Sequence, residues 1–394
     1  MSESKSPASQ ALDVLSAVRE RYGRAAATPS RELCCPTPQD QGRLGLLPRE
    51  ILERDYGCGD PSRFARPGEV VLDLGSGAGK ACFLASQRVG ASGRVIGVDA
   101  TSEMLALARA HQREVGERIG WHNVEFRRGH IQDLALDLDK LEDWLAAHAV
   151  HDAAGWERLR AEEERLRREE PLIPDASVDL VISNCVLNLV AHEDKQRLLA
   201  EIQRVLRPGG RCAISDITCD EDVPSELMRD PDLWSGCIAG ALREDRFLQA
   251  FADAGLYGVE LVSRQESPWA VVRGIEFRSV TVLAWKGERG PCLDHHEAVI
   301  YNGPWKEVVD DEGQRLRRGE RTAVCRRSFM AYTREPYCAH VTAVVPRAPV
   351  GERDARVLES CCSAVRDPRV TKAGPARADR LPGDSSCCEP SSCC

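Results

Sequence analysis

Cysteines are the residues of this sequence most able to do chemistry, and three of them stand in distinctive local sequences. Cys58 lies between two glycines, Cys185 lies in Ser-Asn-Cys-Val-Leu-Asn-Leu, and Cys237 ends Leu-Trp-Ser-Gly-Cys. A thiolate is a nucleophile and a ligand for soft ions, so cysteines from separate segments could together hold a soft metal or metalloid. The alternative for each is a small apolar core residue, because free cysteines are often buried.

The abundance of cysteine points to the same chemistry. The 394 residues include 17 cysteines, and eight of these form four pairs that are adjacent in sequence. In a reducing compartment thiols stay free, so this pattern favours soft-ion binding or thiol exchange over a disulfide scaffold. The pairs near the carboxyl end could deliver a soft ion to the three cysteines above, or simply sequester it. The pairs are Cys34–Cys35, Cys361–Cys362, Cys387–Cys388 and Cys393–Cys394.

A glycine-rich loop forms a second group with chemical potential. The run VVLDLGSGAGK at 70–80 places Gly75, Gly77 and Gly79 directly after an apolar strand that contains Asp73. Glycines allow a tight turn and close approach of the backbone to a ligand. The spacing differs from the dinucleotide fingerprint, and a carboxylate at this place would repel a pyrophosphate. It suits a ligand with an amino group, such as the methionine part of S-adenosylmethionine (AdoMet).

Residues after the next two strands complete the expected cofactor site. Asp99 ends the second strand, where a carboxylate can accept hydrogen bonds from both ribose hydroxyls. His130 and Ile131 follow the third strand, where the adenine ring would lie. We therefore expect the cofactor to be bound by Asp73, Gly75, Ser76, Gly77, Gly79, Asp99, His130, Ile131 and Ser183.

The elements that must position these residues read as an α/β fold. From about residue 66, short apolar runs alternate with helical segments, which predicts βαβ units and a mostly parallel sheet covered on both faces. We expect a doubly wound, Rossmann-like sheet of seven strands. The strands are predicted at 70–74, 94–98, 124–127, 178–183, 211–215, 258–263 and 279–285, and the helices at 79–89, 102–115, 195–206 and 244–254.

Composition excludes some classes of protein. The formal net charge is −9, which argues against a nucleic-acid-binding protein with a basic surface. No run approaches the ~18 apolar residues of a membrane helix, so we expect no membrane partner. The first ten residues lack the apolar region of a secretory signal, so we expect a cytoplasmic protein.

The glycine loop, Asp99 and the βαβ pattern together resemble the seven-stranded AdoMet-dependent methyltransferases over about residues 67–285. The YGCG, SNCVLNL and LWSGC segments resemble the arsenite methyltransferases over about residues 20–285. This second resemblance implies that Cys58, Cys185 and Cys237 bind As(III), with a fourth cysteine at Cys34 or Cys35. It implies arsenite or its thiol conjugates as substrate and a thiol reductant, the thioredoxin or glutathione system, as partner.

With this resemblance, the chain divides into four expected segments. Residues 1–66 form an N-terminal helical lid that contributes cysteines, and 67–285 form the methyltransferase domain with a helical insertion at about 134–174. Residues 286–345 are expected to form a small β-rich module with a hairpin turn at 310–313, and 346–394 a disordered, cysteine-rich tail.

Two other functions stay open at this point. One is another small-molecule AdoMet methyltransferase with incidental cysteines, and the other is a non-enzymatic metalloid-binding resistance protein. A zinc site in the β-rich module is a weaker possibility, since its cysteines and histidines match no regular ligand spacing and structural or incidental roles fit them better. These residues are Cys292, His295, His296, Cys325 and Cys338.

Overall fold

A computed structural model describes residues 7–28, 41–288, 290–358 and 364–373. The chain forms two compact units, which divide between Gly287 and Glu288 and are described separately below. The two N-terminal adjacent cysteines and the six cysteines beyond residue 360 lie outside the described residues. These are Cys34, Cys35, Cys361, Cys362, Cys387, Cys388, Cys393 and Cys394.

The first unit is built on a sheet whose main path has seven strands, as expected from the sequence. The strand order is β3-β2-β1-β4-β5-β9-β7, and two short strands, β6 and β8, pair with β5 and β9. The first five strands of the path are parallel, whereas β9 is antiparallel to both β5 and β7. The strands are β1 (Val70–Leu74), β2 (Arg94–Asp99), β3 (Val124–Arg128), β4 (Val178–Asn184), β5 (Leu206–Cys219), β6 (Leu242–Arg243), β7 (Leu256–Arg264), β8 (Ala270–Val272) and β9 (Ile275–Lys286).

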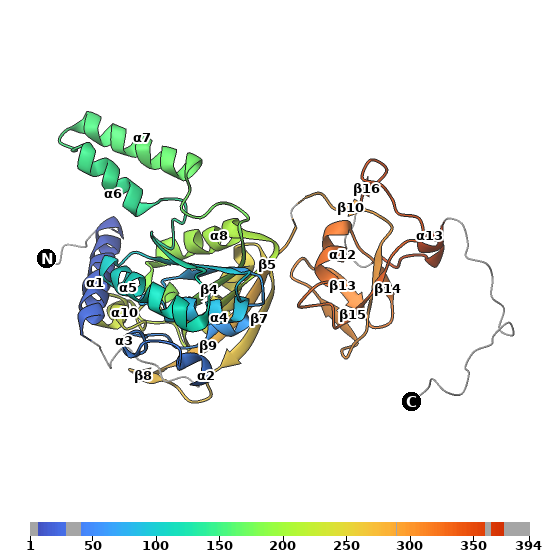
Figure 1. Ribbon diagram of the computed structural model, residues 1–394. Helices are drawn as coiled ribbons and strands as arrows, with labels where there is room; N and C mark the ends of the chain where they lie inside the picture. The colour runs from blue at the N-terminus through green and yellow to red at the C-terminus, as the bar shows by residue number, and fades with distance from the viewer. Residues whose placement is uncertain (1–6, 29–40, 289, 359–363, 374–394) are drawn as a thin grey trace. The chain divides into compact units, whose positions relative to one another are not determined.

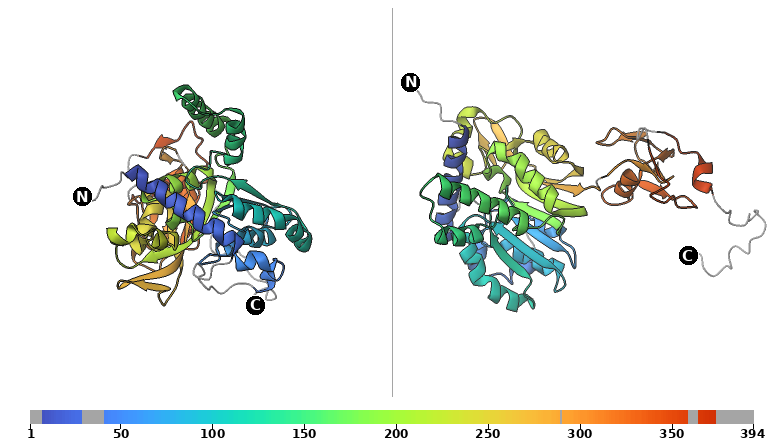
Figure 2. Two further views of the ribbon diagram at one scale, coloured as in Figure 1. Left: turned by 90° about the vertical axis from the view of Figure 1, so that its left-hand side faces the viewer. Right: turned by 90° about the horizontal axis from the view of Figure 1, so that it is seen from above.

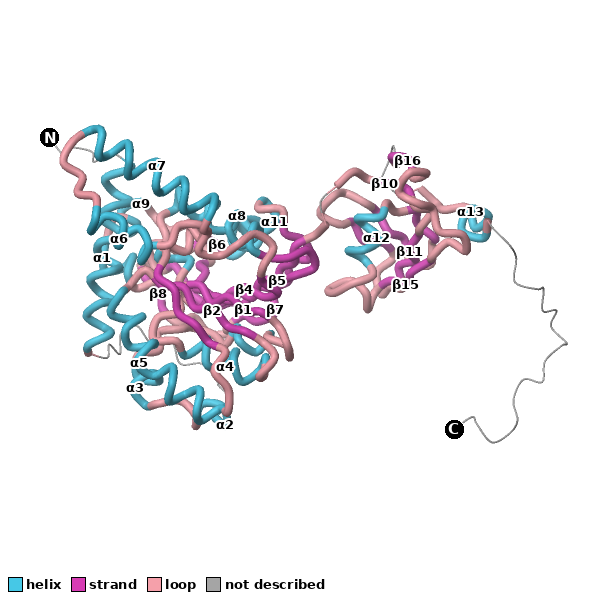
Figure 3. The backbone as a smooth tube through the Cα atoms, turned by 45° about the horizontal axis from the view of Figure 1, so that its top comes forward, coloured by secondary structure: helices cyan, strands magenta, loops and turns pink. Residues whose placement is uncertain are grey.

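Helices cover both faces of this sheet, as Figure 3 shows. Alternate residues of a strand point to opposite faces, so neighbours such as Val71 and Leu72 enter different apolar clusters. The cluster of Val71 includes α4 and α5, and the cluster of Leu72 includes α8 and α11. None of the described helices is long and apolar enough to cross a membrane. The four helices are α4 (Lys80–Val89), α5 (Ser102–Ile119), α8 (Lys195–Val205) and α11 (Glu244–Asp253).

The N-terminal helix α1 (Pro7–Ala27) packs across the unit, as the left view of Figure 2 shows. It contacts α5, the short helix α10 (Pro231–Ser235) and the 3₁₀ turn η3 (Leu187–Leu189). Arg21 anchors it by donating to the carbonyl of Asp232 at 2.9 Å and to Ser235 Oγ at 2.7 Å. The helix therefore covers segments that follow the carboxyl ends of the strands. The other short helices are α2 (Gln41–Leu44), α3 (Arg49–Glu53), η2 (Pro61–Phe64), η4 (His192–Asp194) and α9 (Ser225–Met228).

The interruption expected at 134–174 contains a helical hairpin that projects from the first unit (Figure 1). Its helices are α6 (Leu138–Ala147) and α7 (Ala153–Glu169), and each begins at an aspartate whose side chain accepts from backbone N–H groups. Lys140 and Glu170 pair between the helices at 2.7 Å. The chain returns to the core at Leu172 and Ile173, which are buried.

The second unit is rich in short strands, with a three-stranded sheet in the order β14-β11-β15. The turn expected at 310–313 joins β12 and β13, which pair as an antiparallel hairpin. The unit extends beyond the expected boundary at residue 345, because Arg366 is buried there and pairs with Asp294 at 2.6 and 2.9 Å. Its elements are β10 (Leu293–Asp294), β11 (Ala298–Tyr301), β12 (Glu307–Val309), β13 (Arg315–Arg317), β14 (Arg321–Ala323), α12 (Arg326–Tyr332), β15 (Val341–Val344), β16 (Arg356–Val357) and α13 (Pro368–Lys372).

The buried ion pair gives a stability prediction for the second unit. Arg366→Ala should destabilise this unit by about 3 kcal/mol, because it leaves Asp294 without its counter-charge. Hydrogen exchange of the amides of β11 and β14 measures the effect. The matched control is Arg327→Ala, which removes a pair with Glu312 that is largely exposed and should cost less than ~1 kcal/mol. Equal losses in the two variants would contradict the prediction.

Candidate functional site

The first unit contains a cavity at the carboxyl ends of its parallel strands. Its walls come from the glycine loop after β1, the end of β2, the segment after β3 and the segment after β4. Helix α1 closes another side with Val18 and Tyr22. Ligand sites of open α/β sheets lie at this edge, so the cavity is where the sequence places its cofactor.

The glycine loop has the conformation that its sequence requires. Gly75 and Ser76 donate their backbone N–H groups to the carbonyl of Val98, at 2.8 and 3.0 Å, and so join the loop to β2. Gly75 has φ +68°, and a Cβ there would lie 2.5 Å from a methyl carbon of Val186. Gly77 has φ +50° and open space around it. The loop therefore combines left-handed backbone with a free surface towards the cavity.

Asp99 supports the loop and faces the same cavity. Its carboxylate accepts from the backbone N–H of Gly77 at 2.8 Å and from that of Thr101 at 2.7 Å. Burial raises the pKa of Asp99, while these hydrogen bonds lower it in part. The carboxylate is thus oriented at the end of β2, where the ribose contact is expected.

Asp73 is almost fully buried beside the cavity, with 1% of its surface exposed. Burial is the main cause that raises its pKa to about 7, and the nearby carboxylates of Asp99 and Asp55 raise it further. The Cys82 thiol, which donates to Asp73 at 3.1 Å, acts in the opposite direction. A carboxyl group with this pKa would be held in its ionised form by a positively charged ligand group.

The donor set of the cavity fits AdoMet. Ser76 Oγ is buried and has no hydrogen-bond partner among the described residues, so it is available to a ligand. Two carboxyl groups, Asp73 and Asp99, match an amino group and ribose hydroxyls. His130 and Ile131 also line the cavity, as expected for the adenine region.

Two of the expected cofactor residues do not line this cavity. Ser183 is fully buried, and its hydroxyl donates to the carbonyl of Leu74 at 3.1 Å, so it joins β4 to β1. Gly79 precedes α4, and a Cβ there would lie 2.7 Å from the ring of Phe126. Both residues therefore stand behind the site in the packing of the fold.

Sequence reasoning missed several residues that line the cavity. Lys80 is buried and forms an ion pair with Asp55, which joins α4 to the segment before Cys58. Thr101 and Gln132 directly follow the expected strand-end positions, so the carboxyl-end rule could have found them. Tyr22 had no such signal, because its place depends on how α1 packs.

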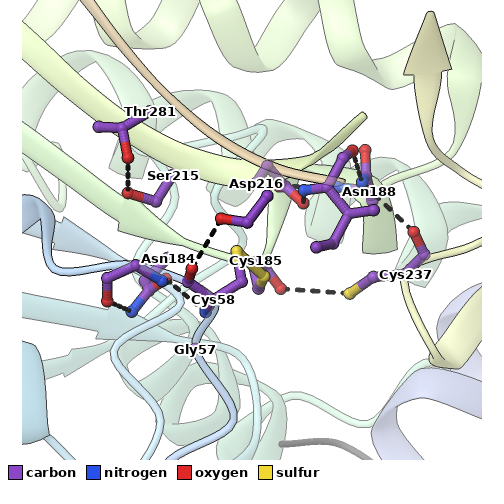
Figure 4. The surroundings of a disulfide bond; sticks show 12 residues. Gly57, Cys58, Asn184, Cys185, Asn188, Ser215, Asp216, Cys237 and Thr281 are labelled. Atoms are coloured by element: carbon purple, nitrogen blue, oxygen red, sulfur yellow. Dashed lines mark hydrogen bonds between the residues drawn. A yellow bond between two sulfur atoms is a disulfide. The ribbon is translucent and has the colours of Figure 1, made fainter. Parts of the chain in front are cut away.

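The three cysteines singled out in the sequence lie together, as Figure 4 shows. Cys58 and Cys185 form a disulfide with a Cα–Cα distance of 5.8 Å, although they are 127 residues apart in sequence. The thiol of Cys237 lies 3.5 Å from the carbonyl oxygen of Cys185. All three are buried in one apolar cluster, and Cys185 also lines the cavity. The expected trio is thus assembled beside the expected cofactor site.

The trio is oxidised in this structure, and this state bears on ligand binding. Among the described residues, no three His, Cys, Asp or Glu side chains are placed to hold a metal ion together. Two of the three sulfurs are joined to each other, and a disulfide sulfur has no thiolate to donate. The site therefore requires a two-electron reduction before it can offer three thiolates.

Other cysteines are separated from the trio by their environments. Cys212 lies within β5, and burial raises its pKa to about 12. Cys219, the last residue of β5, belongs to the same apolar cluster as the trio. Burial raises its pKa to about 12 as well, and its thiol donates to the carbonyl of Ala241 at 3.9 Å. Both thiols are therefore poor sources of thiolate at neutral pH.

The chain is similar to known methyltransferases. Residues 65–166 and 146–255 match a family described as a methyltransferase domain, and residues 288–376 match a domain of unknown function. The arsenite methyltransferase of Aquipseudomonas alcaligenes is 35% identical over 294 residues, which cover 72% of this chain and 75% of that protein. The arsenite methyltransferase of Halobacterium salinarum is 40% identical over 213 residues, which cover 54% of this chain and 44% of that protein.

The chain is also similar to a solved methyltransferase structure. The crystal structure of an arsenic(III) S-adenosylmethionine methyltransferase from Chlamydomonas reinhardtii matches with a TM-score of 0.52 and 27% identity. The match covers 80% of this chain and 99% of that chain.

The glycine before Cys58 gives a testable prediction. A Cβ at Gly57 would lie 2.0 Å from Asn184 Nδ2, so Gly57→Ala should shift the Cys58 turn and cost about 1–3 kcal/mol in urea unfolding. The matched control is Gly23→Ala in α1, where the nearest atom would be 3.7 Å away. That change should stabilise the protein by about 0.5–1 kcal/mol. A neutral Gly57→Ala would show that the turn is not tightly packed.

Proposed function

The chain belongs to the arsenite methyltransferase family, and we propose that it transfers the methyl group of AdoMet to As(III) held by Cys58, Cys185 and Cys237. The observation that carries the proposal is that three cysteines from distant segments meet in one buried cluster beside the cofactor cavity. Trivalent arsenic is soft and prefers sulfur ligands to oxygen or nitrogen.

Arsenite binding follows from the chemistry of the reduced trio. Arsenous acid carries three hydroxyl groups, and each can leave as water with the proton of one thiol as an As–S bond forms. The product is neutral, which suits a cluster whose other members are apolar, among them Leu189, Ile217 and Phe277. Either arsenite itself or a conjugate with small thiols could enter this exchange.

The residues of the cavity bind and orient the cofactor. Asp73 faces its amino group, Asp99 accepts from its ribose hydroxyls, and Ser76 and the glycine loop contact the intervening part. AdoMet, when bound, supplies an electrophilic methyl group that the arsenic lone pair can take without acid–base help. Cys185 both lines the cavity and binds arsenic in this proposal, so the chain contributes chiefly by alignment.

The disulfide fits the electron balance of the reaction. Methyl transfer formally oxidises arsenic by two electrons, and two bound thiolates can return these by leaving arsenic as a disulfide. Two of the proposed ligands, Cys58 and Cys185, would form the disulfide that the structure contains. We propose that Cys34 or Cys35 exchanges with it and that a cellular thiol, from thioredoxin or glutathione, supplies the reducing equivalents. A reducing compartment such as the cytoplasm provides these thiols.

Arsenic speciation tests the proposed function. Purified protein with arsenite, AdoMet and a thiol reductant should yield methylated arsenic, detected by chromatography with elemental mass detection. Cys185→Ser should lower the rate at least 100-fold, because arsenic loses the ligand next to the cofactor. The matched control is Cys338→Ser, which changes an exposed cysteine of the second unit and should keep the wild-type rate. Methylated arsenic formed by Cys185→Ser at the wild-type rate would contradict Cys185 as an arsenic ligand, and AdoMet binding without any arsenic turnover would exclude this substrate.

Asp73 gives a prediction for the pH dependence of AdoMet binding. Without a ligand the pKa of Asp73 is about 7, so below pH 7 its carboxyl group is mostly protonated. It must then release a proton before it can form an ion pair with the amino group of AdoMet. AdoMet affinity should therefore rise from pH 5 to pH 7, by up to about tenfold per pH unit, and then level off. Asp73→Asn should bind more weakly at pH 8 and show a flat profile over this range. Calorimetry in buffers of different ionisation enthalpy measures the affinity and the released proton, and equal profiles would contradict the role of Asp73.

The raised pKa of Asp73 also predicts how the stability of the unliganded protein depends on pH. Because the folded pKa of Asp73 is raised, its contribution to stability is present at low pH and is lost as pH rises through about 7. The unliganded Asp73→Asn variant should thus gain unfolding free energy relative to wild type between pH 5 and pH 8.

A further inference from the structure

We infer that Asn184 and Asn188 are positioning residues that fix Cys58 and Cys237, respectively, relative to Cys185. The inference rests on the proposed function, since it concerns how three sulfur atoms are held for one arsenic atom. It goes beyond that function because neither asparagine is one of the proposed ligands.

Asn184 holds the turn that carries Cys58. Its side-chain oxygen accepts from the backbone N–H groups of Cys58 and Gly59, both at 2.9 Å, and its Nδ2 donates to the carbonyl of Gly59 at 2.8 Å. The turn approaches so closely that a Cβ at Gly57 would overlap the Asn184 amide, and a Cβ at Gly59 would lie 2.5 Å from Ser215 Oγ. The close approach therefore requires glycine at both positions: Gly57 leaves room for Asn184, and Gly59 leaves room for Ser215.

Asn188 holds the segment that carries Cys237. Its Nδ2 donates to the carbonyl of Ile217 at 2.6 Å and to that of Cys237 at 3.4 Å, and its backbone N–H donates to Asp216 at 3.3 Å. The backbones meet closely here too, since a Cβ at Gly240 would lie 1.9 Å from the carbonyl oxygen of Asn188. Asn188 is 1% exposed, so water does not compete for these bonds.

Cys185 lies between the two asparagines and is itself fixed. Its backbone N–H donates to the carbonyl of Ser215 at 2.8 Å, and its φ of +59° lies in the left-handed region. Cys237 has φ +63°. Non-glycine residues adopt this region at a cost and persist there only when surrounding contacts impose it. The hydrogen bonds of one short segment, which Figure 4 displays, thus orient both neighbouring loops around Cys185.

This arrangement predicts that each asparagine acts through one cysteine only. Three As–S bonds require three sulfurs at fixed separations. A cysteine on a mobile loop must be ordered when arsenic binds, and this entropy cost lowers the affinity for arsenic. Asn184→Ala should weaken binding only where Cys58 is a ligand. Asn188→Ala should weaken binding only where Cys237 is a ligand.

Phenylarsenoxide is the probe for this test, because it forms two As–S bonds and so reports on pairs of cysteines. The full chain is used, with the eight cysteines of the four adjacent pairs replaced by serine to remove competing dithiols. Cys58→Ser leaves the Cys185–Cys237 pair, and Cys237→Ser leaves the Cys58–Cys185 pair. The proteins are reduced with a phosphine, and bound arsenic is measured by equilibrium dialysis with elemental detection.

The expected result is a crossed pattern. In the Cys237→Ser background, Asn184→Ala should weaken phenylarsenoxide binding at least tenfold and Asn188→Ala less than twofold. In the Cys58→Ser background the two effects should be reversed. A double-mutant cycle of this kind separates a coupling to one residue from general destabilisation.

Controls keep the test decisive. Asn123→Ala is the matched variant, because Asn123 also holds a glycine turn, with bonds to the carbonyls of Gly90 and Gly93 at 2.8 and 3.0 Å, and it precedes β3, at the amino ends of the parallel strands. It should leave both affinities within twofold of their backgrounds. Urea unfolding of every variant identifies losses that reflect unfolding, and for a variant that fails to fold Asn→Ser replaces Asn→Ala.

The outcomes distinguish the inference from the proposed function. The double variant Cys58→Ser/Cys237→Ser, which retains only Cys185 of the trio, gives the background binding. If neither cysteine pair binds phenylarsenoxide more tightly than this variant, the proposed arsenic site is refuted. If both pairs bind but each asparagine variant weakens both pairs equally, the site stands and the separate positioning roles are refuted.

Discussion

The parallel pairing of β4 with β1 on one side and β5 on the other is the constraint on which the site depends. The register aligns Leu74 with Ser183 and Asn184 with Ser215, so β1 and β4 end next to each other, whereas β5 continues to Cys219. The glycine loop and the segment with Cys185 consequently leave the sheet together, beside Ser215 of β5. The Cys58 turn is held by Asn184 at the end of β4, and helix α1 contacts η3, which follows β4.

The apolar strands and the glycine loop could be predicted because their signals are local. The strand predicted at 70–74 is β1 itself, and the others lie within the observed strands. β5 is an instructive difference, since it was expected only over 211–215 but begins at Leu206 and continues through Pro208 and two glycines, residue types that favour turns. Pairing with β4 at one end and along β9 from Arg211 onward overrides that local preference.

The remaining features of the site could not be predicted because they depend on contacts between distant segments. The three cysteines could be singled out from their local sequences, but Asn184 has no local signal for its bonds to Cys58 and Gly59, 125 or 126 residues away. The positive φ values of Cys185 and Cys237 likewise follow from packing. Ser183 was expected at the cofactor but instead joins β4 to β1. It lies one residue before the end of β4, so its side chain is still inside the sheet and not at the edge where the cofactor would bind.

Burial gives the cysteines of this unit different chemical roles. Burial raises the pKa values of Cys212 and Cys219 to about 12, so both thiols stay protonated at neutral pH. The trio is also buried, but Cys185 borders the cavity and is joined to Cys58 by a disulfide. In the function proposed above, arsenic binds the trio with neutral charge, which avoids the desolvation cost of three separate thiolates in an apolar cluster. The burial that makes a lone thiolate unfavourable is thus compatible with the proposed neutral, three-sulfur arsenic complex, and the disulfide is likewise a neutral state of two of these cysteines.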